Sequence, residues 1–171
     1  MSMKAWIGAS VDKLNDVNSW TGRIHIHKHL FIAQVLAVAN VPFQFELYHF
    51  GPYSFEADHV IAEMEAFGEL EKTYVRPGYG PTYKTTDLAE DAVSDEDAAA
   101  LSCVADQLRG FNSGDLELIA TCLWVARREG EADERVIIDR VKEIKPKYST
   151  LRIQSALVQA RQLASKLEQV G

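Results

Sequence analysis

Apolar residues recur every three or four positions in the first part of the chain. Within residues 2–15 they are Met3, Trp6, Ile7, Val11 and Leu14. This spacing places them on one face of a helix. Between Arg23 and Ala39 the sequence becomes apolar on almost every side after Lys28, which predicts a central helix packed from several directions. Asn40 and Pro42 are expected to end that helix.

The pattern changes to alternation in FQFELYHF, residues 43–50. Phe43, Phe45 and Leu47 fall on one side of this run, as they do in a β-strand. The strand is expected to stop before Pro52, because proline fixes φ and has no N–H to donate to a neighbouring strand. The chain is therefore predicted to turn at the Gly51–Pro52 corner.

The next segment reads as a capped helix followed by a hairpin. Ser54 can cap the first turn of a helix, and Gly68 is well placed to end it. Two short β-prone runs, LEKTYVRPG and GPTYKTT, then flank a Pro- and Gly-rich tip at residues 77–81, which predicts a hairpin with a tyrosine packed at its base. Helix, helix, strand, helix and hairpin is the order of a winged helix.

The second half of the chain predicts helices only. Residues 85–108 contain seven acids and no Lys or Arg, so this stretch is the expected boundary between a winged-helix-like lobe, 1–90, and a four-helix lobe, 91–171. Helices are predicted from Ser94 to Gly110, 115–128, 134–144, and from Ser149 onward. The expected fold is mainly α, with a winged-helix-like N-terminal lobe, a small β-hairpin wing and a helical C-terminal lobe, packed as one unit.

Composition restricts where the protein acts. The 171 residues have a formal net charge of −7, which weakens a general attraction to nucleic acids. The longest apolar run, LFIAQVLAVA, is too short to span a bilayer, and the first residues lack the apolar core of a signal peptide. Cys103 and Cys122 do not form a metal-type pair, so a reducing cytoplasm is expected.

Three alternate histidines, His25, His27 and His29, are the most conspicuous candidate metal ligands. On a helix only His25 and His29 share a face, and no Cys or carboxylate follows at a spacing that completes a tetrahedral set. We therefore interpret HIHKH as the partly exposed polar start of the central helix. No metal, no cofactor and no catalytic group is expected, and the protein is predicted not to be an enzyme.

The helix after the Gly-Pro corner is acidic and contains no Lys or Arg. In a winged helix this element would read DNA, and its carboxylates would repel phosphates. We therefore expect the corner and this helix to contact a protein partner that is basic, such as a toxin or a protease substrate. The predicted contact residues are Tyr48, Tyr53, Glu56, Asp58 and Glu63.

The alternative is a DNA-binding regulator. Residues 135–171 carry a net charge of +5, in contrast to the acidic remainder of the chain, and a homodimer would double this basic patch. The residues predicted to contact phosphates are Arg76, Lys84, Lys142, Lys145, Lys147 and Arg152. This alternative requires the hairpin and the basic segment to lie on one face.

The same strings resemble a known family. GRIHIHKHLFIAQ from Gly22, FELYHFGPYS from Phe45, LEKTY and PTYKTT are similar to the YwgA-like proteins and, more distantly, to the Panacea antitoxin domain and its SocA-type relatives. GDLELIATCLWVARREG and ERVIIDRVKEIKPKYSTLRIQSALVQARQL resemble the YwgA-like C-terminal pattern, so the resemblance covers most of the chain. The most specific matches are Gly51, Pro52, Tyr53 and Ser54 with Lys28, and Lys145, Pro146 and Lys147.

The resemblance implies a small helical protein with a winged-helix-like portion and no established enzyme activity. Panacea-type relatives act as antitoxins, or as adaptors that bring a partner to a protease, and such genes also occur among phage-defence functions. The chain departs from the family pattern at His27 and His29, where the family favours an uncharged polar residue. We therefore expect an antitoxin-like or adaptor regulator that works through protein–protein contacts.

Overall fold

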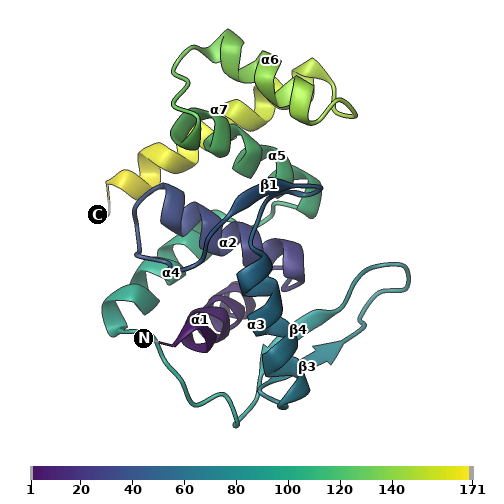
Figure 1. The fold of residues 1–171 in the computed structure, drawn as a ribbon, viewed down its shortest axis with the longest axis vertical. Coiled ribbons are helices and arrows are strands. Elements are labelled where there is room, and N and C mark those ends of the chain that lie inside the picture. Colours follow the sequence, from purple (N-terminus) through teal and green to yellow (C-terminus); the bar gives the residue numbers. More distant parts are fainter. Residues whose placement is uncertain (1, 170–171) are drawn as a thin grey trace.

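The structure, a computed structural model, describes residues 2–169. Most of them form α-helices, and two small antiparallel sheets interrupt the first half (Figure 1). The first half contains α1 (Met3–Asp16), α2 (Arg23–Val35), β1 (Glu46–Tyr48), β2 (Gly51–Tyr53), α3 (Phe55–Ala66), β3 (Leu70–Thr73) and β4 (Thr82–Thr85). The second half contains α4 (Asp95–Gln107), α5 (Ser113–Leu123), the π-helix η1 (Trp124–Arg128), α6 (Glu134–Ile144) and α7 (Thr150–Glu168). The predicted fold class is confirmed.

The central helix is α2, and all of residues 25–33 are buried. It ends earlier than expected, because the chain turns at Ala37, which has a φ of +54°. The side-chain amide of Gln34 donates to the carbonyls of Val41 (2.8 Å) and Phe43 (2.7 Å). These two bonds anchor the loop that leads from α2 to the first sheet.

The first sheet differs from its prediction. Instead of one strand over 43–50, β1 and β2 form a short antiparallel hairpin in which Leu47 pairs with Pro52. Pro52 thus lies inside a strand rather than beyond one, which a hairpin of two edge strands tolerates. Gly51 has a φ of +85°, and a Cβ on it would lie 2.9 Å from Thr121 Oγ1 on α5. The hairpin backbone therefore rests directly on α5.

The capped helix and the wing follow as predicted. The Ser54 side chain accepts a hydrogen bond from the Ala57 backbone N–H at 3.1 Å, and Gly68 takes the left-handed conformation just after α3. Strands β3 and β4 pair antiparallel, and Tyr83 is buried at the base of their hairpin. Residues 71–80, which include the tip, are all exposed.

The helices of the second half begin at side-chain caps. Ser94, Asn112, Asp133 and Ser149 each accept a hydrogen bond from a backbone N–H of the first turn. The predicted helix over 115–128 is present, but its last turn is the π-helix η1 rather than α-helix. A π turn carries an extra residue between hydrogen-bonded positions, and the sequence pattern contains no signal for it.

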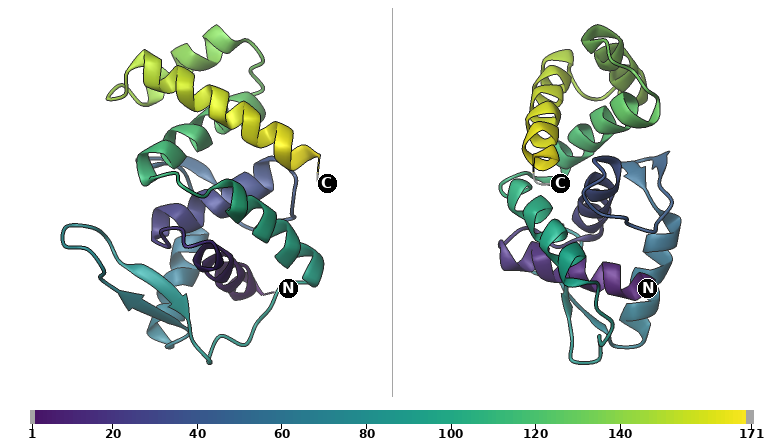
Figure 2. Two further views of the ribbon diagram at one scale, coloured as in Figure 1. Left: turned by 180° about the vertical axis from the view of Figure 1, so that it is seen from behind. Right: turned by 90° about the vertical axis from the view of Figure 1, so that its left-hand side faces the viewer.

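One apolar core runs through both halves of the chain. Helix α4, which follows the expected boundary at residue 90, packs on α1 and α2, while α5 packs on α2 and α7. Helices α6 and α7 lie at one end of the molecule and the β3–β4 hairpin lies toward the other (Figures 1 and 2). No helix within residues 2–169 is both long enough and apolar enough to cross a bilayer.

Candidate functional site

The three histidines of α2 are buried, which corrects the expectation of a partly exposed polar helix start. His29 Nε2 lies 2.8 Å from the Leu101 carbonyl oxygen, so this nitrogen donates, and Nδ1 then accepts from the Ser10 hydroxyl at 2.8 Å. His27 Nδ1 accepts from the Ser54 N–H at 3.1 Å. Burial lowers the pKa of His29 to about 4 and that of His27 to about 3, so both rings are neutral near pH 7.

These rings connect α2 to neighbouring elements. His25 Nε2 lies 3.3 Å from the Phe111 carbonyl, in the segment before α5. His29 joins α2 to α1 and α4, and His27 joins it to the residue that caps α3. Within residues 2–169 no group of three or more His, Cys, Asp or Glu side chains is arranged to hold a metal ion.

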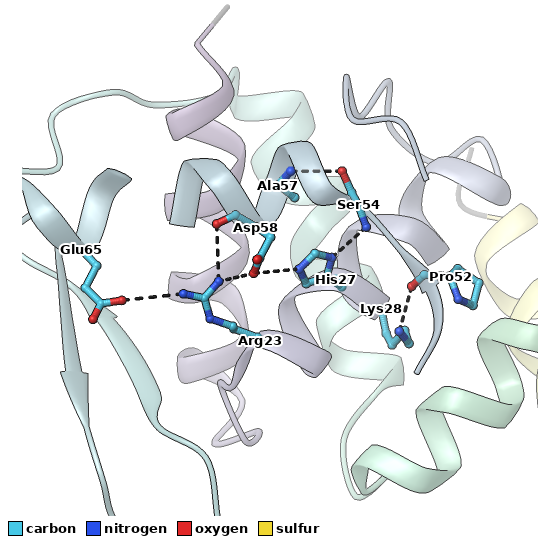
Figure 3. A network of polar contacts seen from close by, with 8 residues as sticks. All are labelled: Arg23, His27, Lys28, Pro52, Ser54, Ala57, Asp58 and Glu65. Carbon is cyan, nitrogen blue, oxygen red and sulfur yellow. Dashed lines mark hydrogen bonds and ion pairs between the residues drawn. The ribbon is translucent and has the colours of Figure 1, made fainter. Parts of the chain in front are cut away.

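Two buried lysines fix the β1–β2 hairpin. Lys28 is fully buried and donates from Nζ to the Pro52 carbonyl at 2.8 Å (Figure 3). Lys145, at the end of α6, donates to the His49 carbonyl and forms an ion pair of 2.9 Å with Glu117 of α5. Burial lowers the pKa of Lys28 to about 7. The hairpin is thus held from α2 on one strand and from the α6–α7 region at its turn.

Lys145, one of the residues predicted to contact phosphates in the DNA-binding alternative, is buried. Only 5% of this residue is exposed, and its Nζ is already paired within the molecule. Its partner Glu117 is also buried, and Glu117 Oε2 accepts from the Tyr148 hydroxyl at 3.0 Å. A charge buried in this way requires an opposite charge nearby, and Lys145 and Glu117 supply it to each other.

An aromatic surface, defined by Tyr48, Phe50, Tyr53 and Phe55, covers the β1–β2 hairpin and the start of α3. Tyr48, Phe50 and Phe55 are 44%, 46% and 48% exposed. The Tyr48 and Phe55 ring centroids lie 4.9 Å apart, and those of Tyr53 and Phe55 lie 5.4 Å apart. Tyr53 is also stacked on the buried His27 ring at 3.9 Å. The predicted Tyr48 and Tyr53 are therefore adjacent, and Phe55 joins them, while Phe50 is exposed in the turn between β1 and β2.

Two of the predicted acidic contacts are paired within the molecule. Arg23 of α2 forms ion pairs with Asp58 and, at 3.8 Å, with Glu65 (Figure 3). Glu63 lies 3.7 Å from Lys4 Nζ. Much of the negative charge on α3 is thus already compensated by α1 and α2. Asp58 and Glu63 are weaker candidates for a basic partner than their sequence pattern indicated.

Glu56 lies beside the aromatic surface, and no ion pair engages it within residues 2–169. Its Oε1 accepts from the Gln44 backbone N–H at 3.0 Å. A recess of about 230 Å³ opens here. The recess is lined by Gln44, Phe45, Glu46, Phe55 and Glu56. It combines two aromatic rings with two carboxylates, and its described lining contains no Lys or Arg.

The basic residues of the DNA-binding alternative are separated. Arg76 lies over the Tyr79 ring at the hairpin tip, and Lys84 is exposed on β4. The others belong to α6, α7 and the connection between them, and these elements lie toward the opposite end of the molecule (Figure 1). There, Lys142 donates to the carbonyls of Pro146 and Tyr148, Lys147 Nζ lies 3.8 Å from Glu117 Oε1, and Arg152 lies 3.3 Å from Asp115.

No family model matches the chain, and no curated protein is significantly similar to it. The resemblance to YwgA-like and Panacea-type proteins therefore remains a prediction. The fold is that of a mainly helical protein with a winged-helix-like first half. Its aromatic surface is exposed on the anchored β1–β2 hairpin and the start of α3.

Proposed function

We propose that the protein is a non-enzymatic recognition module, an antitoxin-like or adaptor regulator, that binds a protein partner through the aromatic surface and the acidic recess beside it. The partner segment presents an apolar side chain to Tyr48 and Phe55 and a Lys or Arg side chain to the recess. The observation that carries this proposal is the recess itself, in which Glu46 and Glu56 stand beside aromatic rings and no cation lines the described walls.

The aromatic content of this surface supports the proposal. Tyr and Phe are enriched where proteins meet, and buried aromatic anchors supply much of the binding energy. A cation over an aromatic face gains about 0.5–2 kcal/mol, more as water is excluded. Carboxylates beside the rings add attraction for the same cation. A basic, apolar segment matches both features, as the acidic composition of the helix after the corner predicts.

The anchoring of the hairpin favours binding because less motion is lost when the partner docks. Lys28 holds a backbone carbonyl of β2, Lys145 holds one in the turn, and the His27 ring stacks on the Tyr53 ring. The surface is thus formed before a partner arrives.

The proposal can be tested with a displayed library of random peptides selected on the immobilised protein. We expect the enriched peptides to combine Lys or Arg with an aromatic or aliphatic residue. Binding of the best synthetic peptide is then measured by fluorescence anisotropy. Glu46→Gln with Glu56→Gln should weaken it about tenfold or more, which is a loss of about 1.4 kcal/mol. The amide introduced by Glu56→Gln still has an oxygen that can accept from the Gln44 N–H, so the change removes charge rather than structure.

Glu63→Gln is the matched control. It removes a charge from the same helix, about two turns away and next to Lys4. Its peptide affinity should stay within about twofold of the wild-type value, well below the tenfold loss that about 1.4 kcal/mol produces. Enrichment of peptides that lack basic residues would refute the proposal, and so would an equal loss in the control and the double variant.

A further inference from the structure

A second cleft, of about 300 Å³, lies away from the aromatic surface. It is formed by the loop after α1, the tip of the β3–β4 hairpin and the connection between α4 and α5. Among its lining residues are Trp20, His25, Arg76, Tyr79, Phe111 and Asn112. Its described lining contains no Asp or Glu. The volume is at the lower end of the range that small-molecule sites occupy.

Two aromatic rings form the outer walls of the cleft. The Trp20 and Tyr79 centroids lie 5.9 Å apart with their planes inclined at 59°. The Trp20 indole packs closely against Gly22, since a Cβ added to this glycine would lie 2.9 Å from Trp20 Nε1. Arg76 lies 4.6 Å over the Tyr79 ring, and the Tyr79 N–H bonds to the Arg76 carbonyl in a tight turn. Because the Trp20 and Tyr79 planes are inclined to each other, a planar ring can stack on one of these faces and meet the other at its edge.

The inner wall offers groups that can recognise the edge of such a ring. His25 is 2% exposed, and its Nε2 donates to the Phe111 carbonyl. Its Nδ1 is then an acceptor, and this nitrogen is itself buried and has no hydrogen-bond partner within residues 2–169. Asn18, Asn112 and Ser113 also line the cleft, and their side chains are of types that carry both donors and acceptors, although Asn112 Oδ1 already accepts from the Asp115 N–H.

Arg76 is the only Lys or Arg that lines the cleft, and no ion pair engages it within the described part of the chain. The nearby start of α5 already carries an anion, since Asp115 accepts from the Asn112 N–H at 3.1 Å. An incoming anionic group would therefore be attracted to Arg76 at the rim of the cleft.

We propose that this cleft binds a nucleobase that carries a sugar phosphate, with the base stacked on one of the Trp20 and Tyr79 rings and packed edge-on against the other, and with the phosphate beside Arg76. Stacking on aromatic side chains is how proteins hold single bases, and hydrogen-bonding side chains at the base edge add selectivity. The same chemistry is presented by a free mononucleotide and by an unpaired base of a single strand. The proposal rests on residues other than those of the partner surface.

Trp20 provides the readout. The protein is titrated with AMP, with adenosine and with a short single-stranded oligoadenylate, and tryptophan fluorescence is excited at the red edge to limit absorption by the ligand. We expect saturable quenching by AMP. Trp20→Phe should abolish the signal although Trp6 and Trp124 remain. Tighter binding of the oligonucleotide than of AMP would identify a nucleic acid strand as the source of the base, and equal or weaker binding would identify the free nucleotide.

Three variants locate the site. Tyr79→Ala should raise the Kd about fivefold or more, as expected when one stacking ring is lost, and Tyr79 is exposed enough for the fold to tolerate the change. Arg76→Ala should weaken AMP more than adenosine. Lys84→Ala, in the same hairpin but outside the cleft, should leave the Kd for AMP and the Kd for adenosine unchanged. Absence of saturable quenching by all three ligands up to about 10 mM would overturn the proposal, as would an unchanged Kd in Tyr79→Ala.

Discussion

At the scale of single residues, the polar groups inside α2 organise the molecule. Lys28 bonds to a carbonyl 24 positions away in the chain, and His29 to one 72 positions away. A buried donor without a partner is costly, so each of these bonds restricts which element can lie beside α2. The histidines are better understood as fixed connectors than as ligands.

Lys28 should give stability a measurable dependence on pH. Its pKa is about 7 in the folded protein, because burial disfavours the charge, against the ordinary value of 10.5. Between these two pH values the unfolded chain holds a proton that the folded protein has lost, so raising the pH favours the folded state. From about pH 7.5 to 9 the free energy of unfolding should rise more steeply in the wild type than in Lys28→Met, by up to about 1.4 kcal/mol per pH unit.

Urea denaturation at several pH values measures this difference. Comparing the slopes of the two proteins cancels groups that titrate equally in both, including Tyr53, Tyr148 and Cys122, whose pKa values burial raises. Parallel slopes would show that Lys28 is charged in the folded protein throughout this range.

At the scale of elements, the β1–β2 hairpin depends on the close approach of its backbone to α5. The sequence indicated the corner but not the hairpin, because the alternation of residues 43–50 is shared by an extended segment and a strand. By contrast, the helix caps at Ser54, Ser94 and Ser149 were predictable, since a cap and the N–H it accepts lie within three residues of each other.

Gly51→Ala should therefore be more destabilising than an equivalent change elsewhere. Gly51 has a φ of +85°, and a new Cβ would also lie 2.9 Å from Thr121 Oγ1 and 3.2 Å from the Glu117 carbonyl. Gly78 has a φ of +81° with nothing within 4 Å, so Gly78→Ala adds strain alone, about 1–2 kcal/mol. Thermal and urea unfolding should show Gly51→Ala losing at least about 1 kcal/mol more. Equal losses would mean that the hairpin moves away from α5 at little cost.

At the scale of the whole molecule, charge pairing changes the interpretation of the sequence. The acidic helix and the basic C-terminal segment form opposite charge blocks along the chain, yet Arg23, Lys4 and Lys145 pair with acids from other elements. These pairs join residues far apart in sequence, so no local pattern reveals them. The aromatic surface could have been predicted from the sequence, because many aromatic residues surround Gly51 and so short a hairpin cannot bury all of them.

The basic residues of the β3–β4 hairpin lie far from those of α6 and α7 (Figure 1), and this separation predicts how the protein responds to duplex DNA. We expect no detectable binding of a mixed-sequence duplex by fluorescence anisotropy at a salt concentration of about 0.15 M, where non-specific DNA binders have a Kd of about 10⁻⁴–10⁻⁶ M. A second titration at about 0.05 M salt tests for weak phosphate contacts. Binding that is strong at low salt and falls steeply as salt rises would instead favour the DNA-binding regulator.

The exposed run at residues 71–80 has a further consequence, for how the chain is cut. Trypsin cleaves poorly before proline, so the Arg76–Pro77 bond resists it, whereas Tyr74 and Tyr79 present open sites to chymotrypsin. A nick there leaves β3 paired with β4 and Tyr83 buried against the core. The two fragments should therefore stay associated as one folded protein. This loop is the preferred position for new chain ends in a circular permutant, in which the original ends are joined.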